Sequence, residues 1–206
     1  MENRIAIPSN EMIASLRDNP NLRYAAKHPL ESHLGFQGIW QCDQVRNGQL
    51  ISGGYPEPPN TFTTEGMARL LNIMFHDIAK AASEIWYVGI FKNNITPAVG
   101  NTAPVHLGAA GTHGECQDAD YDDPATDKPA YTTADTATAS ITNSVAGKAE
   151  FTIAAGITVY GAFLSTMAAK TATTGYLMAA KKFTAARAVI DDDILYVTYT
   201  ISATTS

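Results

Sequence analysis

A dense apolar run near the middle of the chain sets the first limit on the fold. The stretch SEIWYVGIFKNN, residues 83–94, carries apolar side chains at both odd and even positions. Because a strand points successive side chains to opposite faces, a strand of this composition buries both of them. Nothing around the run resembles a catalytic motif. We therefore expect it to be the central strand of a β core, with one face packed on a helix.

The helix that we expect to cover this strand lies just before it, at about residues 64–82. Its apolar residues recur every three or four positions, which is the period of one helix face. They are Met67, Leu70, Leu71, Met74, Ile78 and Ala81. Thr63 or Thr64 can cap the first turn, and Glu65 lies near the positive end of the helix dipole. The sequence predicts one amphipathic helix here.

Short strands separated by turns account for most of the chain after residue 36. Asn47-Gly48 predicts a hairpin, because both central residues of a type I′ turn need positive φ. Ala155-Gly156 separates two further strands. The strand-like stretches downstream are KAEFTIAAGITVYGAFLS, TGYLMAAKKFTAARAVI and DILYVTYTISA. This pattern is typical of an antiparallel β-sandwich, so we predict a mainly β, jelly-roll-like single domain over residues 36–206.

The N-terminal segment, residues 1–35, lacks the pattern of a folded core. Pro8, Pro20 and Pro29 interrupt it, and its large apolar residues are too sparse to build a core by themselves. Such a segment suits an extended N-terminal arm that lies on the surface of another protein. The candidate contact residues of this arm are Ile5, Ile7, Leu22 and Tyr24.

Composition and charge limit the classes of partner. Of the 206 residues, 45% are apolar, which is enough for a core, and only 17% are charged. The net charge of −6 argues against nucleic acid as a partner, since phosphate affinity needs clustered Lys and Arg. We see neither an apolar run of the length of a membrane span nor a secretory signal, so no membrane partner is expected. Cys42 and Cys116 lack paired spacing, which indicates reduced thiols and synthesis in a cytoplasm.

The long loop at about residues 93–130 holds the cluster that most resembles a chemical site. The cluster comprises His113, Glu115, Cys116, Asp118, Asp120, Asp122 and Asp123. Asp118, Asp120 and Asp122 match alternate ligand positions of an EF-hand loop. The match then fails, because Asp123 stands at the glycine position and Pro129 at the glutamate position. A solvated acidic loop is the favoured interpretation, a weak cation site is the next and catalysis the last, so we predict no cofactor and no metal.

The remaining polar groups indicate structure rather than catalysis. The triplet Asp191–Asp193 is typical of a turn whose side chains bond their own backbone, with acid–base carboxylates as the alternative. The histidines are scattered: His76 lies on the polar edge of the predicted helix, and His28 and His33 lie in the arm. No motif of a nucleotide, metalloprotease or nucleophile site is present. We expect no enzyme activity.

Five blocks of sequence follow one another between about residues 36 and 203. They are NTFTTEGMARLLNIMF, EIWYVGIFKNNITPAVGNTA, AEFTIAAGITVYGAFLS, TTGYLMAAKKF and ARAVIDDDILYVTYTIS. In order and spacing these blocks resemble a family of tailed-bacteriophage virion proteins that are described as capsid cement or decoration proteins. The chain departs from the family pattern where the acidic loop is inserted before Tyr131.

The resemblance implies a non-enzymatic virion protein that binds the major capsid protein on the outer surface of the capsid and stabilises the shell. Weak contacts that repeat over a lattice add through effective concentration. We expect a homo-oligomer, with a trimer favoured over a dimer because capsid lattices offer local threefold points. Two alternatives stay open. One is a tail, fibre or baseplate component that binds a host surface glycan, and the other is a hydrolase that uses the acidic loop.

Overall fold

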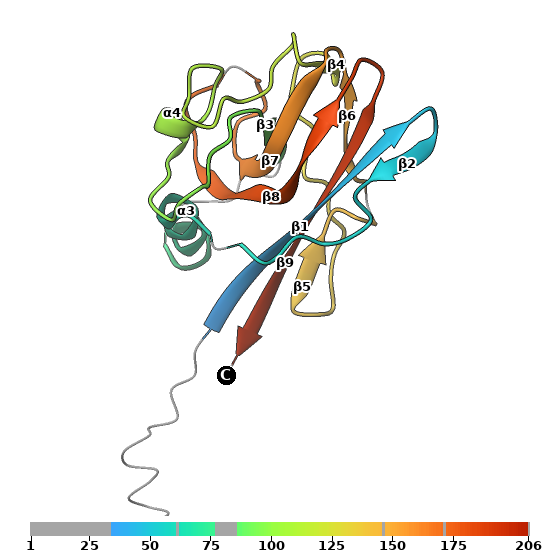
Figure 1. Cartoon of the computed structure of the whole chain (residues 1–206). Coiled ribbons are helices and arrows are strands. Elements are labelled where there is room, and N and C mark those ends of the chain that lie inside the picture. Colours follow the sequence, from blue (N-terminus) through green and yellow to red (C-terminus); the bar gives the residue numbers. More distant parts are fainter. Residues whose placement is uncertain (1–33, 61, 77–85, 146, 171, 206) are drawn as a thin grey trace, which may run out of the picture. The chain divides into compact units, whose positions relative to one another are not determined.

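Two antiparallel β-sheets form the scaffold of the described chain (Figure 1). The six-stranded sheet contains β1 (Leu34–Arg46), β2 (Gln49–Ser52), β4 (Tyr121–Asp123), β5 (Ser140–Thr142), β6 (Ala149–Ile153) and β9 (Ile194–Thr205), in the order β2-β1-β9-β6-β4 with β5 also paired to β9. The three-stranded sheet contains β3 (Tyr87–Phe91), β7 (Ile157–Ser165) and β8 (Leu177–Val189), in the order β3-β7-β8. Buried side chains from both sheets share one hydrophobic cluster. The prediction of a mainly β, antiparallel sandwich is confirmed.

The structure is a computed structural model that describes residues 34–60, 62–76, 86–145, 147–170 and 172–205. Residues Phe36–Thr204 belong to one compact unit. The candidate arm contacts Ile5, Ile7, Leu22 and Tyr24 lie outside the described residues, as do residues 77–82 of the predicted helix. The arm and its contacts therefore stay predictions.

The hairpin between β1 and β2 has the predicted turn. Asn47 and Gly48 both have positive φ, at 50° and 76°, and Arg46 pairs with Gln49 across the turn. The two strands are thus joined by a two-residue loop of type I′ character. This prediction is confirmed.

An aromatic stack fixes the inner face of the six-stranded sheet. Trp40 on β1 and Tyr199 on β9 are fully buried, and their rings stack with centroids 3.9 Å apart and planes at 17°. Alternate residues of β1 and β9 point the same way, so Cys42 and Val197 join the same cluster. A side chain at Gly38 would overlap the Tyr199 ring. The stack therefore depends on glycine at this position.

Two reciprocal glycine–phenylalanine pairs join β3 to β7. Gly89 lies opposite Phe163, and Phe91 lies opposite Gly161. Each phenylalanine ring covers the glycine of the other strand, so closely that a Cβ added at either glycine would overlap the ring. At Gly161 the added Cβ would also overlap the backbone oxygen of Lys181 on β8. The WYVGIF run at β3 and the TVYGAF run of β7 therefore place a glycine opposite a phenylalanine in both directions across the sheet.

The three-stranded sheet is buried on both faces, as the apolar run of β3 predicts. One face contributes Val88, Ile90 and Leu164 to the main core. The other face carries Phe91 and Phe163, which pack with Leu107 in a second cluster. That second face is covered by the loop after β3 rather than by the predicted helix. The sequence-based position of the strand is also wrong: β7 is central in this sheet and β3 lies at its edge.

The predicted helix exists as α3 (Thr64–Phe75), and it begins where expected. Thr63 caps it, because its side-chain oxygen accepts a hydrogen bond from Gly66 N at 3.0 Å. A side chain at Gly66 would overlap the backbone of Met178 on β8, so the helix lies against β8. Among the described residues the helix ends at Phe75, and His76 has extended backbone angles.

The segment predicted as a long loop contains two short elements, α4 (Ala103–His106) and β4. Its first part pairs with the end of β3. Lys92 N donates to Gly114 O at 2.9 Å, Asn93 N to His113 O at 3.0 Å and Cys116 N to Ile90 O at 3.0 Å. The segment is therefore built onto the sandwich.

Gly161→Ala tests the reciprocal pairing. We expect it to lower the free energy of unfolding by about 2 kcal/mol or more, because overpacking displaces buried groups and both neighbours of Gly161, a buried ring and a strand backbone, are fixed. Gly100→Ala is the matched control, since a side chain there would meet no atom within 4 Å. Urea unfolding of both variants measures the difference. Equal stability of the two variants would contradict the packing described for β3 and β7.

Candidate functional site

The predicted acidic loop is held by a buried ion pair. Lys128 Nζ lies 2.9 Å from Glu115 Oε1, and both side chains are fully buried. Lys128 also donates to Ala169 O at 2.7 Å, and Glu115 Oε2 accepts from Gly108 N at 2.7 Å. Burial raises the pKa of Glu115, while the Lys128 ammonium opposes that rise. The pair joins three separate loop segments and has no water-facing atom with which to act on a substrate.

A second set of ion pairs surrounds Tyr121. Asp120 is buried and accepts from Lys92 Nζ at 2.8 and 2.7 Å. Lys170 Nζ donates to Tyr121 O at 3.1 Å, lies 3.9 Å from the centroid of the Tyr121 ring and pairs with Asp118 at 3.0 Å. The interpretation of a solvated acidic loop is therefore wrong for Glu115 and Asp120.

The carboxylates of this loop do not gather around a common point. Within the described ranges, no three His, Cys, Asp or Glu side chains are grouped so that they can hold a metal ion. Asp120 faces Lys92, whereas Asp122 is exposed. The ligand spacing of the EF-hand type therefore does not produce a shared site among the described residues.

The Asp191–Asp193 triplet forms the predicted turn between β8 and β9. Asp192 has a positive φ of 64°, and Asp193 Oδ2 accepts from Ile190 N at 3.0 Å. Asp193 also accepts from Arg46 on β1 at 2.6 and 2.7 Å. The Arg46 hydrogen bonds are the main cause that lowers the pKa of Asp193 to about 2. This carboxylate ties the turn to β1, so its role is structural.

His113, a member of the predicted cluster, is buried in the loop. Its ring is fully buried and stacks on Phe91, with centroids 5.0 Å apart, and the ring of His106 lies 4.9 Å away. Neither ring nitrogen of His113 has a hydrogen-bond partner among the described residues. Burial is the main cause that lowers the pKa of His113 to about 4, and His106 lowers it further. His76 is exposed, as predicted, while His28 and His33 lie outside the described residues.

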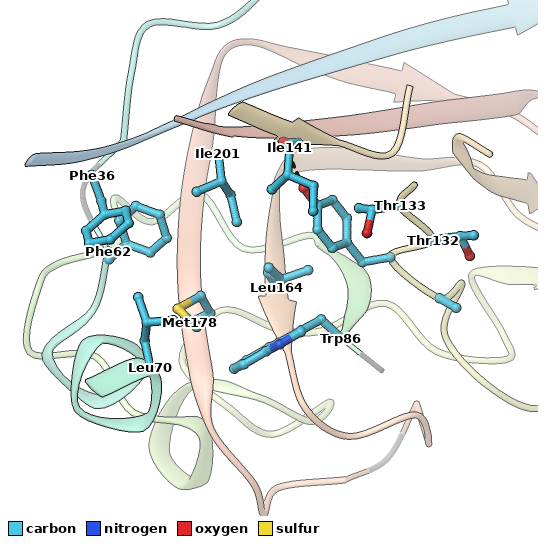
Figure 2. Close-up of a pocket in the computed structure, with 12 residues that line it drawn as sticks. Phe36, Phe62, Leu70, Trp86, Thr132, Thr133, Ile141, Leu164, Met178 and Ile201 are labelled. Carbon is cyan, nitrogen blue, oxygen red and sulfur yellow. Dashed lines mark hydrogen bonds between the residues drawn. The ribbon is translucent and has the colours of Figure 1, made fainter. Parts of the chain in front are cut away.

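The described residues leave an apolar pocket where the two sheets separate (Figure 2). Its volume is about 540 Å³, within the range of about 300–1,000 Å³ that is usual for ligand pockets. The lining residues are Phe36, Phe62, Leu70, Trp86, Ala130, Tyr131, Thr132, Thr133, Ile141, Leu164, Met178 and Ile201. In Figure 2, Ile141 and Ile201 point from the six-stranded sheet toward Leu164 and Trp86. None of these lining residues is charged.

Hydrogen bonds to neighbouring strands fix the polar groups at the pocket. Tyr131 OH donates to Tyr199 O at 2.9 Å, and Tyr131 N donates to Trp86 O at 2.6 Å. Trp86 is only partly buried and packs against the main core. The pocket can therefore hold an apolar group, with the Thr132 and Thr133 hydroxyls as the polar side chains nearby.

Sequence reasoning missed this pocket because its walls come from distant segments. Each strand contributes one or two ordinary core residues, and no local pattern marks them as a group. The aromatic residues Trp86 and Tyr131 were the available signal, but at strand spacing they first indicate core. The exposed edge of Trp86 appears only in the folded structure.

Comparison with known proteins adds no assignment: no family model matches the chain, and no curated protein matches it. Both cysteines are free, as the sequence predicts, and both are buried. Among the residues that the structure describes, no helix is long and apolar enough to cross a membrane. The resemblance to phage virion proteins stays a prediction.

Because His113 is buried, we expect the free energy of unfolding to fall in acid. In the unfolded state His113 has the ordinary histidine pKa of about 6.5. In the folded state its pKa is about 4, so between these two pH values only the unfolded state binds the proton. The contribution is thus complete above pH 6.5 and is lost as the pH falls toward 4, by roughly 3 kcal/mol in all. His113→Phe should flatten the decline of unfolding free energy over this range by about one proton.

Val145→Phe, which adds the same ring at an exposed position, is the control and should keep the slope of the parent protein. Urea unfolding at a series of pH values measures both slopes. If His113→Phe and Val145→Phe decline alike, the unpartnered burial of His113 is not the cause.

Proposed function

We propose that this chain is a structural protein of a tailed-phage virion, and that it acts as a cement or decoration protein. It binds the shell of major capsid protein from outside and stabilises it, without catalysis. The observation that carries the proposal is the open, uncharged apolar pocket between the sheets. Such an opening suits a protein partner that inserts an apolar side chain.

The residues that carry the family resemblance support the same proposal. They form α3, β3 and the strands from β6 to β9, together with the turns between them. These residues supply much of the core and half of the twelve residues that line the pocket. The inserted acidic segment distinguishes this chain from the family pattern.

The buried polar groups also favour a structural role. The strongest candidates for acid–base chemistry, Glu115, Asp120 and Asp193, are each engaged by a lysine or arginine. These pairs hold loops onto the sandwich and limit their motion. A protein that resists outward pressure on a shell needs such rigidity, and it needs no open reactive group.

Several copies would act together on the shell. A pocket that takes one apolar side chain contributes modest affinity, but contacts at symmetry-related positions add through effective concentration. The arm residues Ile5, Ile7, Leu22 and Tyr24 supply the second contact in this proposal. The protein is made in the host cytoplasm, joins the outer surface of the capsid and forms a homo-oligomer there, with a trimer favoured by local threefold points.

A tail, fibre or baseplate component that binds a host glycan is the second candidate. The partly buried Trp86 and the adjacent hydroxyls of Thr132 and Thr133 favour it, because sugars stack on aromatic rings and bond to hydroxyls. The lining residues include no carboxylate, amide or charged side chain. Such groups give sugar sites their orientation, so the pocket fits an apolar side chain better.

Rebinding to depleted particles tests the proposal. Particles assembled without this protein should lose heat resistance and packaged DNA, and added protein should restore both. Ile201→Glu, which places a charge in the pocket, should weaken rebinding at least tenfold. Ile190→Glu is the control. Ile190 is exposed and lies before the start of β9, whereas Ile201 lies near the end of that strand.

Trp86 provides an independent signal, since Trp40 is fully buried and Trp86 lies at the pocket. Its fluorescence should change when shells are added. Depleted particles that keep their heat resistance and do not rebind the protein would overturn the proposed function. Equal rebinding of the two glutamate variants would exclude the pocket as the contact.

A further inference from the structure

We propose that β2 is an interface strand that pairs with β2 of a second copy of this chain across a twofold axis. This inference is independent of the phage assignment, since it rests on one edge of the six-stranded sheet. Strand β2 is terminal in that sheet, next to β1. Figure 1 shows β2 at the outer side of the β1–β2 hairpin.

The edge formed by β2 is apolar and uncharged. Leu50 is 57% exposed and Ile51 is 47% exposed, and Tyr55, just after the strand, is 80% exposed. The four residues of β2, QLIS, include no Lys, Glu, Asp, Arg or Pro. Proteins usually protect a sheet edge with charges, proline, a β-bulge, a very short strand or a covering segment. β2 has only four residues, and its pairing with β1 shifts register between Leu50 and Ser52, but it has neither a charge nor a proline.

Three other edge strands, β8, β3 and β4, are contacted by other segments of the chain. Along β8, Thr63 N donates to Met178 O and Thr184 N donates to Glu57, at 2.9 and 2.7 Å. Along β3, Val88 N donates to Pro129 O at 2.9 Å. At β4, Lys170 donates to Tyr121 O at 3.1 Å.

No comparable contact from the described residues reaches the outer edge of β2. The protection of β8, β3 and β4 shows that this chain can cover an edge by several means. Among the residues that the structure describes, the outer edge of β2 is therefore free to pair with a partner strand.

The hairpin register defines which backbone groups are available. Arg46 pairs with Gln49 and Val45 pairs with Leu50. In an antiparallel ladder, hydrogen-bonded and non-hydrogen-bonded pairs alternate, and the pair that closes a two-residue turn is hydrogen-bonded. The N–H and C=O of Leu50 therefore point away from β1, toward the open edge.

A second copy fits these groups with twofold symmetry. Leu50 lies opposite Leu50 of the partner subunit and exchanges both backbone hydrogen bonds with it, at a Cα separation of about 5.5 Å. In that register Gln49 lies opposite Ile51 of the partner subunit. Because β2 carries no charge, the self-pairing opposes no like charges, which is the usual obstacle to an isologous contact.

The twofold contact is small, so its affinity in solution is modest and rises where copies are concentrated on a surface. It predicts a dimer, whereas the threefold lattice argument predicts a trimer. The two assemblies differ in mass and in the residue on which they depend. Leu50 is therefore the residue to test.

Cross-linking of the full chain tests the contact directly. Leu50→Cys should form a covalent homodimer under mild oxidation, because a Cα separation of about 5.5 Å suits a disulfide. The native thiols should not form disulfides under these conditions, because Cys42 and Cys116 are buried and burial raises the pKa of Cys42 to about 12. Val145→Cys, at a position 85% exposed, is the control for random collision.

Sedimentation equilibrium up to about 1 mM protein gives the second measurement. Leu50→Lys opposes two charges at the contact, and Leu50→Pro removes an N–H that β1 does not use. Both should weaken dimerisation at least tenfold, while Val145→Lys should not. Urea unfolding of each variant verifies that the fold is kept.

The expected result is a dimer that Leu50→Lys and Leu50→Pro dissociate and that Leu50→Cys traps faster than Val145→Cys. A protein that stays monomeric at the highest concentration overturns the proposal. So does a trimer or dimer that is insensitive to both Leu50 variants, or equal cross-linking of the two cysteine variants.

Discussion

The fit of two glycines against two phenylalanines determines how the smaller sheet is built. Because Phe163 covers Gly89 and Phe91 covers Gly161, β3 and β7 can pair with large rings on one face of the sheet. Those rings are the foundation for the segment after β3: His113 stacks on Phe91, and Lys128 lies 5.9 Å above the Phe163 ring. The opposite face of the same strands contributes to the main core. One local packing arrangement thus connects both layers of the sandwich to the acidic segment.

The acidic segment becomes structural through this packing. Once its backbone pairs with the end of β3, Glu115 and Asp120 are drawn out of water and need cations. Lys128 and Lys92 provide them. The buried acidic residues therefore hold the loops of the chain itself. The surfaces that we propose for binding are apolar: the pocket at Trp86 and the edge at β2. These two surfaces account for the low share of charged residues better than a reactive site does.

The sequence allowed good prediction of elements whose signal is local. The alternation in β9, the type I′ turn at Asn47-Gly48 and the cap at Thr63 each depend on neighbouring residues, and all three are present. Prediction failed where the partner lies far along the chain. An apolar face shows that something covers a strand but not what, so the helix was assigned to β3 when it lies on β8. Likewise an aspartate pattern does not reveal that Lys92 and Lys128 neutralise the loop.

The central claim, that the protein binds a capsid shell as a structural component, is tested most directly by locating it in the particle. Electron cryo-microscopy of virions that carry a labelled form of the protein gives both its position and its copy number. Our account predicts many copies at regularly repeated positions on the outside of the head. Finding a few copies confined to the tail, or none in the particle, would contradict it.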